Sequence, residues 1–191
     1  MPKIDPTKSV LLLMDFQNAI VGMMGDAGAA LLERAQKARA AARAIGMAVM
    51  HVRVAFTDAG YAAVSARNKS FAALGKSRFL TDGTPQAAIH DALAPMADEE
   101  VFTKHRVGAF STTNLAARLA ARGIDTLVLT GIATSGVVLS TVRDAADHDY
   151  RLFVIADCCG DADAEVHCVL TEKVFPRQAD VISLDAFVRG G

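Results

Sequence analysis

The segment Leu127-Val-Leu-Thr-Gly-Ile-Ala-Thr-Ser-Gly-Val-Val-Leu-Ser-Thr-Val-Arg-Asp144 combines a strand, a tight turn and the start of a helix. Its first residues are continuously apolar, as expected for a strand that is buried on both faces. Gly131 lies in the turn, and Gly136 lies near the helix N-terminus. A strand that leads directly into a helix is the repeating unit of a parallel α/β sheet. This segment therefore indicates the fold class.

The rest of the chain repeats the alternation of strand-like and helix-like segments. Strand-like segments occupy residues 9–15, 47–56, 100–104, 126–130, 151–157 and 180–184. Helical patterns occupy residues 29–45, 84–94, 113–122, 135–147 and 164–174. Such an order predicts right-handed crossovers and a six-stranded parallel sheet, flanked by helices in a three-layer, Rossmann-like α/β fold. We expect a single domain over residues 1–191, and the long irregular stretch 57–83 is typical of a functional loop or lid.

Composition limits the classes of function. A chain of 191 residues with 52% hydrophobic and 21% charged residues is globular rather than disordered. Its net charge of −1 offers no attraction for nucleic acid or an anionic membrane. The polar start, Met1 to Ser9, is unlike a signal peptide, and nothing approaches the roughly 20 apolar residues of a membrane span. Three cysteines without a secretion signal do not suggest disulfides. We therefore expect a cytoplasmic protein.

Three candidate features fall at the carboxyl edge of the predicted sheet, where ligands bind in such folds. Asp15 ends the first strand, and packing against Leu and Met side chains should raise its pKa and suit it to acid or base chemistry. Alternatively, it only caps the next turn. Lys104 ends the third strand and could keep Asp15 ionised, bind a carboxylate or stabilise an oxyanion. Alternatively, Lys104, His105 and Arg106 form a solvated basic turn.

The turn from Gly131 to Gly136 is the third feature. At a helix N-terminus its backbone N–H groups could bind an anion or a developing oxyanion. The simpler reading is a structural turn that starts a helix.

Together these residues resemble the isochorismatase-like (cysteine hydrolase) superfamily. The resemblance rests on Asp15 in Leu11–Asn18, on Lys104 with the following Val107-Gly-Ala-Phe-Ser-Thr-Thr-Asn-Leu115, and on the turn 131–136. It implies an Asp15–Lys104 pair, a cis peptide at Ile132–Ala133 and a homo-oligomer, either a dimer or a tetramer. Most amidases of that family carry a nucleophilic cysteine at the position that we match to Gly136. The isochorismatase subgroup has glycine there and cleaves a vinyl ether without a thiol.

The resemblance implies a thiol-independent hydrolase of a small metabolite that carries a carbonyl or carboxylate group. The predicted catalytic residues are Asp15, Lys104 and Gly136, and the predicted substrate-binding residues are Ile132, Ala133, Thr134, Ser135, Arg53 and Arg67. The chain departs from true isochorismatases because its turn lacks their aromatic and histidine residues. Both vinyl ether and amide substrates therefore remain open, and no cofactor is expected.

Other nucleophiles and metals are less well supported by the sequence. Ser135 has no Gly-x-Ser-x-Gly elbow and no histidine placed by sequence to activate it. Cys158 and Cys159 resemble a non-catalytic family segment and read as buried thiols, and Cys168 reads as a core residue of a helix. The histidines form no short-range ligand pair, so no metal site is expected, and His167 reads as structural.

A second hypothesis is a catalytically inactive relative that binds a small ligand or assembles with partners. Loss of the usual nucleophile favours it. The retention of both Asp15 and Lys104 favours an enzyme.

Overall fold

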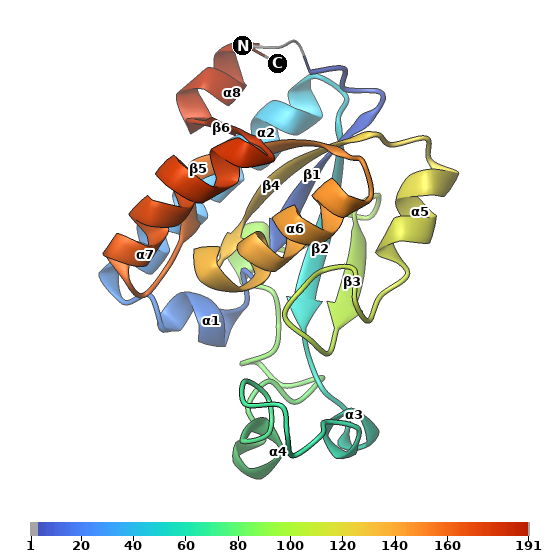
Figure 1. Cartoon of the computed structure of the whole chain (residues 1–191), viewed down its shortest axis with the longest axis vertical. Coiled ribbons are helices and arrows are strands. Elements are labelled where there is room, and N and C mark those ends of the chain that lie inside the picture. The colour runs from blue at the N-terminus through green and yellow to red at the C-terminus, as the bar shows by residue number, and fades with distance from the viewer. Residues whose placement is uncertain (1–3, 191) are drawn as a thin grey trace.

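The computed structural model describes residues 4–190, which form one parallel sheet with helices on both faces (Figure 1). The six strands lie in the order β3-β2-β1-β4-β5-β6, so β1 and β4 are central. Their bounds are β1 Ser9–Met14, β2 Ala48–Val54, β3 Glu100–Lys104, β4 Thr126–Ile132, β5 Arg151–Gly160 and β6 Asp180–Ile182. The predicted fold is confirmed. Residues 1–3 and 191 of the predicted domain, and so part of its polar start, lie outside the described residues.

The helices connect the strands as predicted, with several differences in extent. Their bounds are α1 Asn18–Gly22, α2 Asp26–Ala44, α3 Asp58–Ala62, α4 Leu74–Ser77, α5 Leu115–Ala121, α6 Leu139–Asp147, α7 Ala164–Val169 and α8 Leu184–Gly190. Short 3₁₀ helices span Asp91–Leu93 and Phe175–Arg177, and π-helical turns span Thr134–Val138 and Leu170–Val174. The predicted helix 135–147 therefore begins as a π-helix, and α1 and α8 were not predicted.

The helix predicted over residues 84–94 is wrong except for its last turn. Its backbone carbonyls are used in tertiary contacts instead. Gln86 O and Ala88 O accept hydrogen bonds from the amides of Ala19 and Asn18, at 3.1 and 3.0 Å. Ala87 O accepts from the Gln17 side chain at 2.7 Å. Since each carbonyl meets a donor from the segment after β1, the chain satisfies its polar groups here without a helix.

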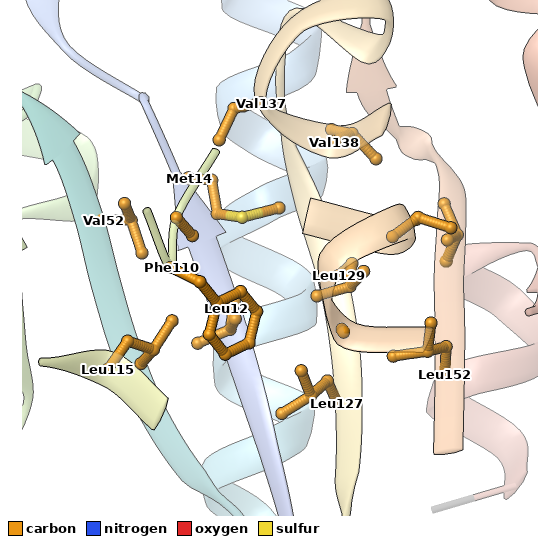
Figure 2. Packing of buried hydrophobic residues seen from close by; sticks show 14 of the residues in the cluster. Leu12, Met14, Val52, Phe110, Leu115, Leu127, Leu129, Val137, Val138 and Leu152 are labelled. Carbon is orange, nitrogen blue, oxygen red and sulfur yellow. The ribbon is translucent and has the colours of Figure 1, made fainter. Parts of the chain in front are cut away.

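Each face of the sheet has its own hydrophobic core because successive strand residues point to opposite sides. The face under α5 and α6 buries Leu12 and Met14 together with residues of β2, β4 and β5, as Figure 2 shows. The opposite face packs Leu11 and Leu13 against α2 and α8. β1 and β4 are buried along their whole length, which explains why both read as uninterrupted apolar runs.

A buried ion cluster joins α2, β2 and the segment before β3. The Glu99 side chain is 1% exposed, and its Oε2 lies 2.8 Å from His51 Nε2. The Met96 amide donates to the same oxygen at 3.1 Å, and Arg43 Nη1 lies 3.1 Å from Oε1. Burial lowers the pKa of His51. For Glu99 burial acts to raise the pKa, but the bonds from His51 and Met96 outweigh it and hold the pKa below its usual value.

Residues 57–83, which we call the lid arm, leave the carboxyl end of β2 and return beside it. The arm carries α3 and α4 and projects beyond the sheet (Figure 1). Its two ends are joined at Phe56, whose amide donates to Leu80 O at 3.0 Å and whose carbonyl accepts from the Asp82 amide at 2.9 Å. Tyr61 stacks on Phe56 with ring centroids 4.9 Å apart. The stretch predicted to be irregular is thus an arm with two short helices, and its Tyr61 and Leu80 share a small hydrophobic cluster with the end of β2 and Ala87.

Candidate active site

Asp15 and Lys104 form a buried ion pair at the carboxyl edge of the sheet. Lys104 Nζ lies 2.8 Å from Asp15 Oδ2, and the two residues are 2% and 4% exposed. Asp15 follows β1 and Lys104 ends β3, and β2 lies between these two strands. The lysine side chain must therefore pass the end of β2 to reach the carboxylate. The pairing predicted from the family resemblance is confirmed.

The backbone after β1 turns sharply to present the Asp15 side chain. Asp15 adopts a φ of 59°, a left-handed conformation that aspartate and asparagine tolerate better than most residues. Its amide donates to Val52 O at 2.8 Å, and its carbonyl accepts from the Gln17 amide at 2.8 Å. Gln17 is itself fully buried and bonds both the amide and the carbonyl of Val54. Although the sequence placed Gln17 beside Asp15, its role in tying β1 to β2 was not predicted.

The two oxygens of the Asp15 carboxyl group have different surroundings. Burial raises the pKa of Asp15, while the positive charge and hydrogen bond of Lys104 oppose that rise. Lys104 engages Oδ2, whereas Oδ1 is buried and has no hydrogen-bond partner among residues 4–190. A buried polar atom without a partner is costly, and such atoms are typical of functional sites. The pair thus combines a carboxyl group of raised pKa with one unoccupied oxygen.

The turn after β4 approaches β1 closely. A side chain at Gly131, whose φ is +157°, would place its Cβ 2.7 Å from Met14 O, so only glycine fits this position. The Ile132–Ala133 peptide is cis, as the family resemblance implies. The chain then enters the π-helical turn Thr134–Val138. The residue before Asp15 and the turn are therefore in direct backbone contact.

Two of the turn amides predicted to meet a substrate already have acceptors within the protein. The Ser135 amide donates to Asp161 Oδ2 at 2.7 Å, and the Gly136 amide donates to Ala133 O at 3.1 Å. Burial acts to raise the pKa of Asp161, but the bonds from Ser135 outweigh it and lower that pKa. The positive end of a helix favours a bound anion. Here that anion is the carboxylate of Asp161, which belongs to the protein itself.

Gly136 and Val137 occupy different surroundings. A Cβ at Gly136 would lie 3.7 Å from Ala133 Cβ and 4.0 Å from Val107 Cγ1, which are ordinary contacts that leave room for a side chain. Val137 is 2% exposed and packs in the same core cluster as Met14, the residue before Asp15 (Figure 2). Whether the position of the family's nucleophile corresponds to Gly136 stays a prediction, and the packing makes Val137 a competing position.

The hydroxyl group of Thr134 and the three thiol groups differ in their partners and in their exposure. Thr134 Oγ1 is hydrogen-bonded to His167 Nδ1 at 2.8 Å, in line with a structural role for His167. Cys158 and Cys159 are buried, and burial raises the pKa of both thiols, that of Cys159 to about 12. Cys168 is exposed, so its prediction as a core residue is wrong. It lies on the solvent side of α7, a helix with no buried residue.

The two arginines predicted to bind substrate are not brought to the Asp15–Lys104 pair by any contact in the described part of the chain. Arg53 Nη2 pairs with Asp82 Oδ1 at 2.7 Å, and its Nε donates to Thr103 Oγ1 at 3.0 Å. Arg67 is exposed on the lid arm. Their roles in binding remain predictions.

Residues 4–190 contain neither a metal-binding cluster nor a membrane-spanning helix. No group of three or more His, Cys, Asp or Glu side chains there could hold a metal ion. No helix in the same range is long and apolar enough to cross a membrane.

Comparisons with known proteins agree on one family. The isochorismatase domain model matches residues 9–186. Maleamate amidohydrolase of Pseudomonas putida is 29% identical over 180 residues, which cover 92% of this chain and 83% of that protein. Ureidoacrylate amidohydrolase of Methylorubrum extorquens is 35% identical over 178 residues, which cover 83% of this chain and 72% of that protein. An isochorismatase family protein from Burkholderia thailandensis superposes with a TM-score of 0.84 at 26% identity, covering 100% of this chain and 98% of its own.

Proposed function

Because the chain belongs to the isochorismatase family, we propose that it is a hydrolase of a small metabolite carrying a carbonyl or carboxylate group, and that it works without a thiol nucleophile. Asp15 is the acid and base of this reaction, and Lys104 is its charged partner. Two of the similar curated proteins are named as amidohydrolases, which supports an amide as one candidate bond. A vinyl ether is the other, since its cleavage begins with protonation and needs no nucleophilic side chain.

The partly engaged Asp15 carboxyl group carries this proposal. Lys104 holds Oδ2, so Oδ1 is the oxygen left to donate a proton to the substrate. In the proposed reaction Asp15 transfers its proton to the substrate, and water adds to the carbon that becomes electron-poor. The resulting carboxylate then accepts a proton from that water, which restores the protonated Asp15. Lys104 stabilises the carboxylate during this interval. The adduct finally breaks its C–O bond to give a ketone and an alcohol when the substrate is a vinyl ether, or its C–N bond to give a carboxylic acid and an amine when the substrate is an amide.

A substrate screen tests the proposed function. We expect purified protein to hydrolyse at least one compound among maleamate, ureidoacrylate and a set of small vinyl ethers, followed by ammonia release or by chromatography of the products. Activity should fall by about 10²–10⁴-fold in the Asp15→Asn variant. If the wild-type protein binds these compounds in calorimetry but converts none of them, a non-catalytic binding protein becomes the better description.

Thiol alkylation is expected to leave the activity unchanged. The exposed Cys168 should react with iodoacetamide, whereas Cys158 and Cys159 should resist it because burial disfavours their thiolates. Mass spectrometry locates the label, and the rate is measured on the same sample. Loss of activity with label on Cys158 or Cys159 would show that one of these thiols takes part in the reaction.

A pair of cysteine variants tests the match between the turn and the family's nucleophile. If Gly136 holds that position, Gly136→Cys should react with iodoacetamide faster than the three native cysteines, because a nearby lysine and a helix start lower a thiol pKa. The position has room for the side chain. Val137→Cys serves as the matched variant, since Val137 packs in the Met14 cluster. If Val137→Cys reacts faster than Gly136→Cys, the position of the family's nucleophile corresponds to Val137 and not to Gly136.

A further inference from the structure

The turn that follows β3 shares the ammonium group of the active-site lysine. Lys104 Nζ bonds Asp15 Oδ2 at 2.8 Å and also donates to the carbonyl of Arg106 at 3.2 Å. The position of the ammonium group therefore depends on where the turn places that carbonyl. The His105 amide is fixed by Thr112 Oγ1 at 2.9 Å on the side of the turn that leads to α5.

The side chains of the same turn contact the lid arm. The His105 ring lies against Phe56, at the base of the arm, with centroids 5.7 Å apart and an interplanar angle of 56°. It also lies beside Gly60 in α3, where an added Cβ would be 3.6 Å from His105 Cδ2. Arg106 Nη2 donates to Ala63 O at 3.4 Å, and its Nη1 donates to the carbonyl of His105 at 2.6 Å.

We propose that residues 104–106 form a latch between the lid arm and the active site. His105 and Arg106 are positioning residues: they hold the arm on the turn, and the turn in turn directs the Lys104 ammonium group at Asp15. This inference rests on the proposed function for its kinetic consequence, but docking of the arm on the latch can be measured without any substrate.

The arm is suited to such a coupling because most of it is exposed to solvent. Its helices have five and four residues, and within residues 57–79 Tyr61 alone is buried. Segments with few buried contacts open locally at low free energy. An aromatic contact such as that of His105 with Phe56 changes an equilibrium by about 2- to 13-fold. Loss of the His105 ring should therefore raise the undocked population of the arm by a factor in that range.

Limited proteolysis measures the docking. Arg67, Lys69 and Lys76 are exposed trypsin sites on the arm, and cleavage there reports the open population when opening is fast relative to cleavage. We expect His105→Ala to be cut at these sites about 2- to 10-fold faster than wild type. Arg106→Ala should change the rate in the same direction. His105→Phe keeps the ring on Phe56 and should be cut at the wild-type rate.

A second histidine provides a matched control. His148 contacts Phe110 with centroids 5.6 Å apart, at the end of α6. His148→Ala removes a similar contact that does not involve the arm, and it should leave cleavage of the arm unchanged. The latch is wrong if His105→Ala is cut at the wild-type rate, if His148→Ala accelerates cleavage equally, or if His105→Phe behaves like His105→Ala.

Steady-state kinetics on a substrate found in the screen separate positioning from binding. If the latch acts through Lys104, His105→Ala should lower kcat in proportion to the docked population that is lost, and His105→Phe should restore it. A rise in KM with kcat unchanged would instead mean that the arm only binds substrate, and the coupling to Lys104 would be rejected. Absence of any substrate would count against the proposed function, while the proteolysis result would still decide whether the latch exists.

Discussion

Replacing Asp15 with asparagine is expected to lower turnover by about 10²–10⁴-fold, the usual contribution of a general acid or base. The amide has the same shape but cannot donate and recover a proton. Asparagine also tolerates the left-handed backbone conformation found here, with φ of 59°. The far-ultraviolet circular dichroism spectrum and the unfolding midpoint should therefore show a folded protein, and kcat measured on the substrate from the screen should show the loss.

The pH profile gives a second measure of the same residue. As a proton donor Asp15 must be protonated, so the rate should fall as pH rises through its pKa, which burial raises above the usual value against the opposing effect of Lys104. The Asn variant should lose this dependence. Asp26→Asn, an exposed substitution with the same change in charge, is the control and should keep both rate and profile. Full activity in Asp15→Asn would remove Asp15 from the mechanism.

The second large effect concerns stability rather than catalysis. Glu99→Ala should lower the free energy of unfolding by about 1–3 kcal/mol, the usual cost of leaving a buried polar group without its hydrogen-bond partner. The substitution leaves His51, which is 1% exposed, without the acceptor 2.8 Å away. It also removes the acceptor of the Met96 amide and one of the two carboxylates that Arg43 contacts. Guanidinium unfolding followed by circular dichroism measures the change.

Asp98→Ala is the matched control for Glu99→Ala. Asp98 also lies 3.1 Å from Arg43, but its side chain is 70% exposed, so its loss should cost at most about 1 kcal/mol. The pH dependence has a defined sign. The folded-state pKa of Glu99 lies below the usual 4.5, so its contribution is present above that pH and is lost as pH falls through the folded pKa. The two alanine variants should therefore converge in acid, and equal effects near neutrality would refute the role of the cluster.

The parts of the site that could be predicted depend on strand ends. Asp15 and Lys104 are 89 positions apart, yet each ends a strand-like segment. The carboxyl ends of parallel strands lie at one edge of the sheet. Their juxtaposition needed only the fold class, and the pairing of one with the other needed the family resemblance. The sheet itself was predictable because β1 and β4 are buried on both faces and leave an uninterrupted apolar signal.

The features that could not be predicted depend on tertiary partners. The sequence of residues 84–90 permits a helix, but donors from Gln17 to Ala19 take its carbonyls. The carboxylate of Asp161 accepts a hydrogen bond from the Ser135 amide, 26 positions away in the sequence. No local sequence pattern predicts this contact. His105 and Arg106 read as a solvated basic turn because the surface that they contact, the lid arm, has no regular periodicity.

The joined ends of the lid arm also bear on how such a protein can diverge. Because Phe56 bonds Leu80 and Asp82 directly, the arm starts and finishes at one point, and lengthening or shortening it leaves the register of the sheet unchanged. The entropic cost of a longer loop grows only slowly with its length. Duplications, deletions and recombination within residues 57–83 can thus be sampled by evolution, or by a designed library, while Asp15 and Lys104 stay on the unaltered scaffold. The arm is therefore the part of this fold whose length can change with the least effect on the strands.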